Sequence, residues 1–563
     1  MKEYKRLKDP IYGYIQIPMK YMSGIVDSAT FQRLRRIIQT SYSPLYSSAV
    51  HNRFVHSLGV YHLGTIAADS LCREIHALRD YLGTFGKSES FKNDLDTYRD
   101  TFLLACLLHD VGHAPFSHTG EKLYLGGTRN SDYSQIHKDL VDAVGLETFE
   151  RDIPDDSNKA APHEIMSAIV GIRAFSEHIP TSEIRDFFAR CITGYKYSEN
   201  TVEASLKNCF VSLLNSKVID VDKLDYLIRD AYITGFDTVS LDYLRLLEAI
   251  TIKGDGTNWE IGYYKDAISV IENVVYAHDA ERKWIQNHPV VLYECYILNH
   301  IFQHLNNQLN TQESKLFSYD SLTVDGHALK GDIKVSLLCD DDIIYLMKNV
   351  DSCKSELALE YFDRSKRRHP IWKSEAEYIA LITHVIGGNA DSMDALEHAM
   401  NVVATYLTKT TDTWTVNDET VEKLEQELQE LHEQPLDSDT IETQAKDKDA
   451  ALKLMKCLIG FAEDYHLVHD FVIIEASQFS SGFAKPDFSK TPITFNSSSV
   501  DEIETDFETV AKPLQPNEQG RKKFYYLFYR RQNDSEEIDK AELCRRLAGQ
   551  FAKPGTKKRV RHR

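Results

Sequence analysis

Apolar residues recur at helical spacing along most of the first 310 residues, and this pattern predicts a mainly α-helical protein. The stretch SATFQRLRRIIQTSY places four apolar side chains on one face of a predicted helix: Phe31, Leu34, Ile37 and Ile38. The stretch TFLLACLLHDVGH is apolar all round, which is typical of a helix in the centre of a core. Pro115 should end that helix, because proline lacks the amide donor that a helix interior needs.

The pattern changes in the second half of the chain. Residues 411–450 are rich in Glu, Asp, Thr and Lys, which predicts a solvated helix followed by a linker. The segments HDFVIIEASQ and RKKFYYLFYRR alternate as strands do, so a smaller α+β region is expected there. The last residues, AKPGTKKRVRHR, are basic and are expected to form a disordered tail.

Composition sets bounds on this picture. A chain of 563 residues is long enough for two to four domains, and 42% hydrophobic with 27% charged residues is ordinary for a globular protein. No apolar run is long enough to span a bilayer and no signal peptide is recognised, so no membrane partner is expected. The nine scattered cysteines include no CxxC pair, which indicates reduced thiols and a cytoplasmic location.

The formal net charge of −20 argues against nucleic-acid binding by the whole surface. A nucleic-acid partner is therefore not favoured, although a local basic site would still allow one. The basic tail leaves a nuclear location open.

The stretch LLACLLHDVGHAPFSH, residues 103–118, raises the main question about chemistry. It begins as a buried apolar helix and ends in four groups that resist burial: His109, Asp110, His113 and His118. Unpaired ionisable groups in such a place would cost several kcal/mol. A divalent metal removes this cost, because imidazole and carboxylate are both metal ligands. An isolated His-Asp pair is more often a structural pair, so the metal hypothesis needs further ligands.

Further ligands stand on both sides of this motif. Upstream, the stretch HNRFVHSLGV holds His51 and His56. Downstream, the stretch VIDVDKLDYLIRD holds four carboxylates: Asp220, Asp222, Asp225 and Asp230. The order His … His-Asp … Asp, spread over separate predicted helices, is compatible with a metal site of mixed nitrogen and oxygen ligands.

Five stretches in one order carry a family resemblance: DPIYGYIQI, VDSATFQRLRRI, HNRFVHSLGV, LLHDVGHAPFSH and IDVDKLDYLIRD. Together they resemble the HD phosphohydrolase superfamily, in its deoxynucleoside triphosphate triphosphohydrolase branch, which includes the animal SAM-and-HD-domain enzyme and bacterial dGTPases. The resemblance covers about residues 5–310 and, more faintly, residues up to 375. It implies an HD-type helical bundle core with a smaller α+β C-terminal region.

This resemblance sets the expected domains. They are an HD phosphohydrolase domain with its core at about 5–310, a helical region with an acidic linker, a C-terminal α+β region of unknown role, and a basic tail: residues 1–375, 376–450, 451–552 and 553–563.

The resemblance also assigns a divalent metal and its ligands. The four implied ligands are His56, His109, Asp110 and Asp222. Nitrogen and oxygen ligands together suit Fe, Mn, Ni, Zn or, less well, Mg, and the sequence does not choose among them.

Residues that act on the substrate follow from the same resemblance. Phosphate contact and proton transfer fall to His113, His118 and His163, with Glu121 as the acidic partner that orients His163. The implied substrate-binding residues are Gln39, Arg53, His118, Lys223, Tyr226 and Asp230. The alternative for His113 and His163 is a structural role behind the metal ligands. Asp225 and Arg229 are interpreted as a helix-surface pair at i,i+4 spacing.

A second nucleotide site is implied at a subunit interface. Its residues would be Lys5, Asp27, Gln32 and Arg35. An activating GTP or dNTP there would favour a homo-oligomer, a dimer of dimers or larger. The alternative is that this helix only shapes the catalytic pocket through Gln39. The leucine that crowds the sugar 2′ position in the animal enzyme falls at Thr40, so discrimination between dNTPs and NTPs is left open, as is base preference.

The expected function is metal-dependent hydrolysis of dNTPs to a deoxynucleoside and inorganic triphosphate. Such an enzyme would deplete dNTP pools and, by analogy, restrict virus or phage replication. Two alternatives remain. One is an HD-type nuclease or phosphodiesterase, because the same metal chemistry cleaves phosphodiesters. The other is a nucleotide-sensing subunit of a complex, with the C-terminal part as the effector.

Overall fold

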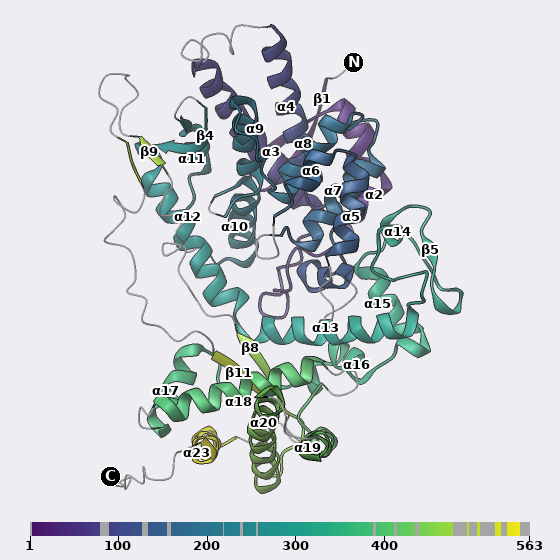
Figure 1. Cartoon of the computed structure of the whole chain (residues 1–563), viewed down its shortest axis with the longest axis vertical. Helices are drawn as coiled ribbons and strands as arrows, with labels where there is room; N and C mark the ends of the chain where they lie inside the picture. The colour runs from purple at the N-terminus through teal and green to yellow at the C-terminus, as the bar shows by residue number, and fades with distance from the viewer. Residues whose placement is uncertain are drawn as a thin grey trace. The chain divides into compact units, whose positions relative to one another are not determined.

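The computed structural model describes residues 3–78, 89–125, 133–154, 159–217, 219–236, 240–254, 257–386, 390–409, 414–433, 439–476, 492–494, 504–506, 524–530 and 538–551. The chain forms two compact units (Figure 1). The first unit comprises residues 1–283, 305–353 and 480–518, and the second comprises residues 284–304, 354–479 and 519–563. The basic tail predicted at residues 553–563 lies outside the described residues.

The first unit opens with a β-hairpin. Strands β1 (Tyr4–Asp9) and β2 (Gly13–Pro18) pair antiparallel, with Tyr4 opposite Pro18 and Asp9 opposite Gly13. The Asp9 carboxylate accepts hydrogen bonds from the amides of Ile11 and Tyr12 across the turn. Gly13 completes the turn with φ +78°, a conformation that L side chains rarely adopt.

Helices make up most of this unit, as the hydrophobic pattern predicts. In chain order they are α1 (Met19–Tyr21), η1 (Met22–Val26), α2 (Ala29–Gln32), η2 (Arg33–Arg36), α3 (Arg53–Leu78), α4 (Glu89–Leu108), η3 (Ser117–Thr119), η4 (Glu121–Leu125), α5 (Ser134–Val144), α6 (Glu147–Arg151), α7 (Pro162–Ala174), α8 (Ser182–Thr193), α9 (Val202–Leu214), α10 (Val221–Thr234), α11 (Tyr243–Glu248), α12 (Ile268–Glu281), α14 (Tyr319–Leu322) and α15 (Asp340–Asn349).

The apolar end of α4 lies in the core of the first unit, where residues 102–108 are buried. Its partner α3 runs alongside, and Gly64 permits the approach, because a Cβ there would lie 2.6 Å from the Cys106 Sγ. Helices α8, α9 and α10 complete the surroundings of this pair. The prediction that TFLLACLLHDVGH is a central helix is thus confirmed up to Leu108.

The helix predicted over residues 28–42 is wrong beyond Arg36. Helix α2 passes into the single turn η2, and Ile37 is already extended at φ −118° and ψ 115°. The chain departs there because residue 38 pairs with residue 52 as an antiparallel bridge. Arg33, in the same turn, is buried, and its guanidinium donates to the carbonyls of Val111 and His113.

A four-stranded sheet completes the first unit. Its strands are β3 (Ile250–Gly254), β4 (Trp259–Tyr264), β9 (Pro492–Thr494) and β10 (Glu504–Asp506) in the order β10-β9-β4-β3. Only the β4–β9 pair is parallel. Residues far along the chain therefore add two strands to a sheet begun before residue 265.

The second unit is a smaller α+β assembly. Its elements include α16 (Glu356–Phe362), β7 (His369–Pro370), α17 (Glu375–Ile386), α18 (Ala390–Lys409), α19 (Asp418–Glu433), α20 (Asp439–Asp464), β8 (Val472–Ala476), β11 (Phe524–Tyr529) and α23 (Lys540–Phe551). The antiparallel sheet has the order β7-β11-β8, and both strand segments expected from alternation form it. Helix α20 begins inside the stretch predicted to be a linker. Helix α13 (Pro289–Leu309) runs through residues of both units.

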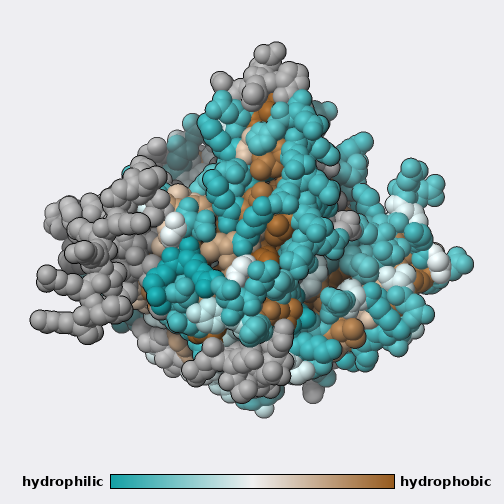
Figure 2. Space-filling model, turned by 90° about the horizontal axis from the view of Figure 1, so that it is seen from below, coloured by the Kyte–Doolittle hydropathy of each residue, from teal (hydrophilic) through white to brown (hydrophobic). Residues whose placement is uncertain are grey.

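The surface is largely hydrophilic on the side that Figure 2 shows. On the face shown in Figure 2, hydrophilic residues cover most of the described area and apolar residues gather in a narrow strip. Among the described residues, no helix is both long and apolar enough to cross a membrane.

A buried ion-pair network holds the second unit together. Arg368 donates to Glu360 at 2.6 Å and to the Tyr293 hydroxyl at 2.9 Å, and it also pairs with Asp470. Arg530 makes a second contact to Glu360 at 2.9 Å. A pair of buried carboxylates thus depends on two guanidinium groups for its charge balance.

We expect Arg368→Met to lower the free energy of unfolding of the second unit by about 3 kcal/mol, because Arg530 is then the cation left to balance two buried carboxylates. Urea denaturation followed by tryptophan fluorescence measures this, since the Trp414 ring lies 4.4 Å from the guanidinium of Arg368. Lys446→Met is the control, because Lys446 forms an exposed i,i+4 pair with Glu442. Equal midpoints for the two variants would contradict the prediction.

Candidate metal centre and active site

Two glycines of the sequence motifs allow the site to form. At Gly59 on α3, a Cβ would lie 1.8 Å from Oδ1 of Asp225, so a side chain there would displace the Asp225 carboxylate of α10 from its place against α3. At Gly112, a Cβ would lie 2.4 Å from the backbone of Met166 and Ser167 on α7. The motif glycines therefore set how closely α10 and α7 approach the residues that carry the chemistry.

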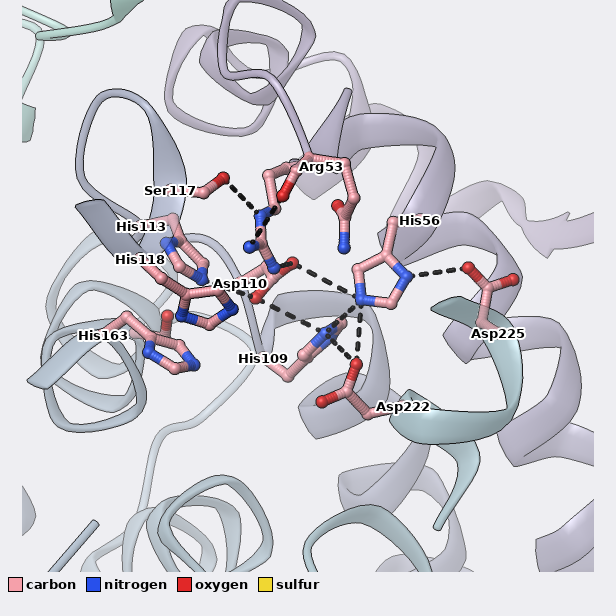
Figure 3. A network of polar contacts seen from close by, with 12 residues as sticks. Arg53, His56, His109, Asp110, His113, Ser117, His118, His163, Asp222 and Asp225 are labelled. Carbon is pink, nitrogen blue, oxygen red and sulfur yellow. Dashed lines mark hydrogen bonds and ion pairs between the residues drawn. The ribbon is translucent and has the colours of Figure 1, made fainter. Parts of the chain in front are cut away.

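The four predicted metal ligands converge on one point (Figure 3). Nε2 of His56 on α3 lies 3.2 Å from Nε2 of His109, which follows the end of α4. Asp110 places Oδ2 at 3.6 Å from Nε2 of His56 and Oδ1 at 3.5 Å from Nε2 of His109. Asp222, in the first turn of α10, completes the set with Oδ1 at 2.9 Å from Nε2 of His56 and 3.7 Å from Nε2 of His109.

This donor set fits a divalent cation. Two imidazole nitrogens and two carboxylates face each other within ligand-to-ligand range, and His56, His109 and Asp110 are buried. Oδ1 of Asp110 is buried without a hydrogen-bond partner among the described residues. A bound cation would satisfy that oxygen. In a purely structural His-Asp pair the oxygen would stay buried without a partner, which costs folding free energy.

A second layer of residues orients His56. Asp225 places Oδ2 at 2.7 Å from Nδ1 of His56 and accepts a hydrogen bond from the Tyr12 hydroxyl at 2.8 Å through Oδ1. Arg229 donates to both oxygens of Asp225 and reaches Asp9 at 3.1 Å. The interpretation of Asp225 and Arg229 as a helix-surface pair is wrong, because both side chains are buried and Asp225 contacts a predicted ligand.

The charged groups of this centre favour the binding of a cation, as their pKa values show. Burial disfavours the charged form of His56, but its contacts with Asp222 and Asp225 outweigh burial and raise its pKa to about 10. Burial also acts against the charge of Asp225, yet Arg229 and His56 lower its pKa to about 2. The pKa of Asp110 is lowered as well, because Arg53, His109 and His56 outweigh its desolvation. The carboxylates are therefore ionised at neutral pH and attract positive charge.

Arg53 joins the metal ligands to the loop that follows them. Its guanidinium donates to Oδ2 of Asp110 at 2.9 Å, to Oγ of Ser117 at 2.9 Å and to the carbonyl of Gln39 at 3.2 Å. The side chain is buried. Arg53 lies at the centre as predicted, but it directly contacts a metal ligand.

Beside Asp110 lies a second cluster of imidazoles (Figure 3). Nε2 of His113 is 3.4 Å from Oδ1 of Asp110. The rings of His113 and His163 stack at 4.2 Å, and the ring of His118 stands edge-on to both, at 5.1 Å and 5.0 Å. Glu121 pairs with Nδ1 of His163, as predicted, and lies 3.6 Å from Nδ1 of His118.

The members of this cluster differ in charge state. Burial, with Arg53 nearby, lowers the pKa of His113 well below its usual value, so His113 is neutral. Burial also acts on His163, but the Glu121 carboxylate outweighs it and raises the pKa of His163 to about 9. His118 is largely exposed, with 63% of its side chain accessible. The cluster therefore offers one protonated imidazole and one neutral imidazole within stacking distance.

The predicted substrate residues other than Arg53 and His118 fall into two groups. Gln39 and Asp230 are linked through His51. The backbone amide of Gln39 donates to the His51 carbonyl, and Nε2 of His51 is 2.7 Å from Oδ1 of Asp230. Oε1 of Gln39, Oγ1 of Thr40 and Nδ1 of His51 are buried without hydrogen-bond partners among the described residues. Each of these unsatisfied polar atoms could bind a polar ligand.

Lys223 and Tyr226 lie on α10. The Lys223 ammonium donates to the carbonyl of Ser216 at 2.7 Å and pairs with Asp220, the N-cap of α10, so its charge is already partnered. Burial raises the pKa of Tyr226 well above its usual value, and Glu281 adds to that shift. Its hydroxyl therefore stays protonated.

The residues predicted for a second nucleotide site lie near the N-terminal hairpin and η2. Lys5 is exposed on β1. Gln32 donates to the Val26 carbonyl at 2.7 Å and accepts from Nε of Arg35 at 2.8 Å. The Arg35 guanidinium also lies 3.5 Å from the ring centroid of Phe54. Gln32 and Arg35 thus hold each other at the surface. Asp27 lies between η1 and α2, two positions before α2 begins at Ala29.

Sequence reasoning missed Asp340. It accepts hydrogen bonds from the amides of Ile38 at 2.8 Å and Phe116 at 2.7 Å, and burial raises its pKa to about 7. Phe116 and Ser117 both have positive φ, 56° and 57°, which is unusual for residues with side chains. No local signal marks Asp340, because it stands more than 220 residues from the loop that it holds.

Comparison with known proteins places the chain among HD-domain proteins. Residues 53–206 match the HD domain family. The chain is 28% identical over 314 residues to an uncharacterized protein of Bacillus subtilis, covering 55% of this chain and 58% of that protein. It is 32% identical over 256 residues to the deoxynucleoside triphosphate triphosphohydrolase SAMHD1 of Gallus gallus, covering 43% of this chain and 36% of that protein.

A crystal structure of a hypothetical protein from Aquifex aeolicus shares the fold. Its TM-score is 0.52 at 16% identity, over 98% of this chain and all of that chain. The chain spans 52% to 61% of the length of the uncharacterized bacterial and archaeal relatives that it matches. The chain therefore carries an HD domain and is similar to the deoxynucleoside triphosphate triphosphohydrolase branch. The HD domain and the His/Asp cluster within it are together consistent with a divalent-metal site.

We expect His109→Ala to abolish metal retention, and Asp225→Asn to weaken metal binding about 10–100-fold because it loosens the hold on His56. Metal content after dialysis and Mn²⁺ titration followed by paramagnetic resonance measure both effects. The control is His76→Ala, which removes an exposed imidazole from α3, the helix that carries His56. Retention of a full metal equivalent by His109→Ala would contradict the assignment.

Proposed function

We propose that this HD-domain phosphohydrolase converts a dNTP to a deoxynucleoside and inorganic triphosphate. The observation that carries the proposal is the position of Asp110, whose Oδ1 lies 3.5 Å from Nε2 of His109 and 3.4 Å from Nε2 of His113. The metal ligands and the histidine cluster therefore form one continuous site. Similarity to curated dNTP triphosphohydrolases supports the choice of substrate.

The chemistry required is attack of water on the α-phosphorus and breakage of its bond to the sugar oxygen. A divalent metal at His56, His109, Asp110 and Asp222 would polarise the phosphate and lower the pKa of the attacking water. The leaving sugar oxygen needs a proton. His163 can supply it, because Glu121 keeps its imidazole protonated at neutral pH.

The remaining histidines would contact the phosphate oxygens. His113 is buried, and both of its ring nitrogens lack hydrogen-bond partners among the described residues, so it can donate one hydrogen bond to an anionic oxygen. His118 stands at the exposed side of the cluster, where the outer phosphates of a triphosphate would extend. Tyr226 and Lys223 lie on α10 beside Asp222 and would contact the sugar and a phosphate.

The deoxyribose would lie against Gln39, His51 and Asp230. Asp230 is held by His51 at 2.7 Å, and Oε1 of Gln39 is unsatisfied among the described residues, so both can bind a sugar hydroxyl. Oγ1 of Thr40 is also unsatisfied there. A free hydroxyl at that position does not repel a ribose 2′-hydroxyl, so we propose that ribonucleotides are disfavoured only weakly.

We also propose a regulatory nucleotide site at Lys5, Asp27, Gln32 and Arg35. The support is that Arg35 and Gln32 are preassembled by a hydrogen bond and that Arg33 on the same turn donates to the carbonyls of Val111 and His113. A nucleotide bound at the η2 turn would therefore act directly on the backbone of the HD motif. A homo-oligomer bridged by that nucleotide is the assembly we propose with it.

We expect the purified chain, incubated with Mn²⁺ and each dNTP or NTP alone and in mixtures, to release intact triphosphate and a nucleoside. Chromatography of both products measures this, and the metal-free His109→Ala variant is the blank. Turnover that appears only in mixtures would support the regulatory site. Release of nucleoside monophosphates from single-stranded DNA or RNA, with no triphosphate from nucleotides, would instead show a nuclease.

We expect Glu121→Gln to move the alkaline limb of the kcat profile from about pH 9 to lower pH. The folded-state pKa of His163 is raised above its ordinary 6.5, so the useful proton is present below that pKa and lost as pH rises through it. Without the carboxylate, burial lowers this pKa, so activity at pH 8 falls more than activity at pH 6. Glu177→Gln, at an exposed site after α7, is the control. An unmoved limb would exclude His163 as the proton donor.

A further inference from the structure

A cavity of about 680 Å³ lies in the first unit, between the hairpin β1–β2 and helices α3 and α4. Figure 1 shows β1 beside α4. No residue that we assign to the metal centre, the substrate site or the regulatory nucleotide site lines this cavity. Its volume is in the range of natural small-molecule sites, about 300–1,000 Å³.

Aromatic rings line the cavity at two depths. Tyr21 and Tyr61 are only 5% and 4% exposed, whereas Tyr4 and Tyr14 on the hairpin are 45% and 62% exposed. His62 adds a fifth ring, and burial lowers its pKa, which keeps it neutral. Buried rings inside and exposed rings at the rim are suited to stack on a planar aromatic ring system that covers the rim when it binds, and Gln16 and Thr65 add polar groups to the lining.

The charged groups of the cavity balance one another. Two acids and two bases line it, and Lys20 pairs with Asp100 at 3.0 Å. Arg99 pairs with Asp69 at 2.7 Å and lies 3.6 Å from Asp100. Both cations therefore already have carboxylate partners, and a phosphate group would have to displace one of them.

We propose that this cavity binds a planar heteroaromatic molecule of nucleoside size that carries no phosphate. The hairpin separates it from the proposed regulatory nucleotide site. Successive side chains of a strand point to opposite faces, so Tyr4 faces the cavity while Lys5 faces away from it. The inference does not depend on which reaction the metal centre catalyses.

A short chain of contacts joins the cavity to the metal centre. The His62 ring lies 5.1 Å from the ring of Tyr12, at the hairpin turn. The Tyr12 hydroxyl donates to Asp225 at 2.8 Å, and Asp225 lies 2.7 Å from Nδ1 of His56. A ligand that shifts the hairpin would therefore change how firmly Asp225 holds a metal ligand, so occupancy of the cavity alters metal affinity.

Calorimetric titration of the full-length chain with adenosine and 2′-deoxyadenosine tests the binding. We expect saturable binding that weakens at least tenfold in the double variant Tyr4→Ser/Tyr14→Ser, whose two side chains are exposed and contribute little to the core. Thr65→Phe, which fills the cavity from α3, should weaken it as much. Tyr345→Ser, which removes a 61% exposed ring on α15 outside the cavity, is the matched control and should bind as the wild type does.

Three results would overturn the proposal. They are no binding of either nucleoside, equal binding by the cavity variants and the wild type, and tighter Tyr14-dependent binding of AMP than of adenosine. The first two would mean that the cavity holds no such ligand, and the third that it selects phosphate.

Mn²⁺ titration with and without adenosine tests the connection to the centre. We expect adenosine to change the Mn²⁺ affinity of the wild type severalfold, and to bind Tyr12→Phe without changing its Mn²⁺ affinity. An identical change in both proteins would show that the cavity does not act through Tyr12.

Discussion

The contact between α3 and α10 at Gly59 is the constraint on which the metal centre depends. Because Gly59 lacks a side chain, Asp225 enters the core and holds Nδ1 of His56, which leaves Nε2 facing His109, Asp110 and Asp222. The buried carboxylate is balanced by Arg229, and Arg229 also reaches Asp9 in the hairpin turn. One close helix approach therefore fixes the tautomer of a ligand and anchors the N-terminal hairpin at the same time.

A second constraint acts on the loop after the HD motif. Two consecutive non-glycine residues with positive φ cost about 1–3 kcal/mol each, and such a loop persists only when its surroundings hold it. Asp340 binds the Phe116 amide, Ser117 bonds to the Ile38 carbonyl, and Arg53 binds Ser117. The strain is thus offset by contacts that also position Arg53 against Asp110. Residues from three distant parts of the chain shape one turn beside the metal ligands.

How far the sequence predicts this arrangement depends on the range of the contacts. Spacing and polarity predicted most of the helices, and buried His and Asp side chains at the end of an apolar helix indicated a metal, because such groups need a partner. The four ligands themselves were assigned by the resemblance to HD phosphohydrolases. The interpretation of Asp225 and Arg229 failed because i,i+4 spacing on α10 says nothing about which face α3 covers. The helix end at Arg36, the role of Asp340 and the addition of β9 to β4 depend on pairings across tens to hundreds of residues, which local patterns do not contain.

The distribution of charge within the site bears on how it would recognise a triphosphate. Arg53 uses three of its guanidinium N–H groups on Asp110, Ser117 and the Gln39 carbonyl, and the Lys223 ammonium is partnered by Asp220. Neither cation meets an incoming phosphate as a free charge. Protonated His163 and the accessible His118 remain, at the side of Asp110 opposite the metal ligands. In the hydrolysis that we propose, an anion would therefore be drawn to that side, with its first phosphate beside Asp110. The reacting phosphorus would then lie between the proposed metal ligands and the proposed proton donor, as that reaction needs.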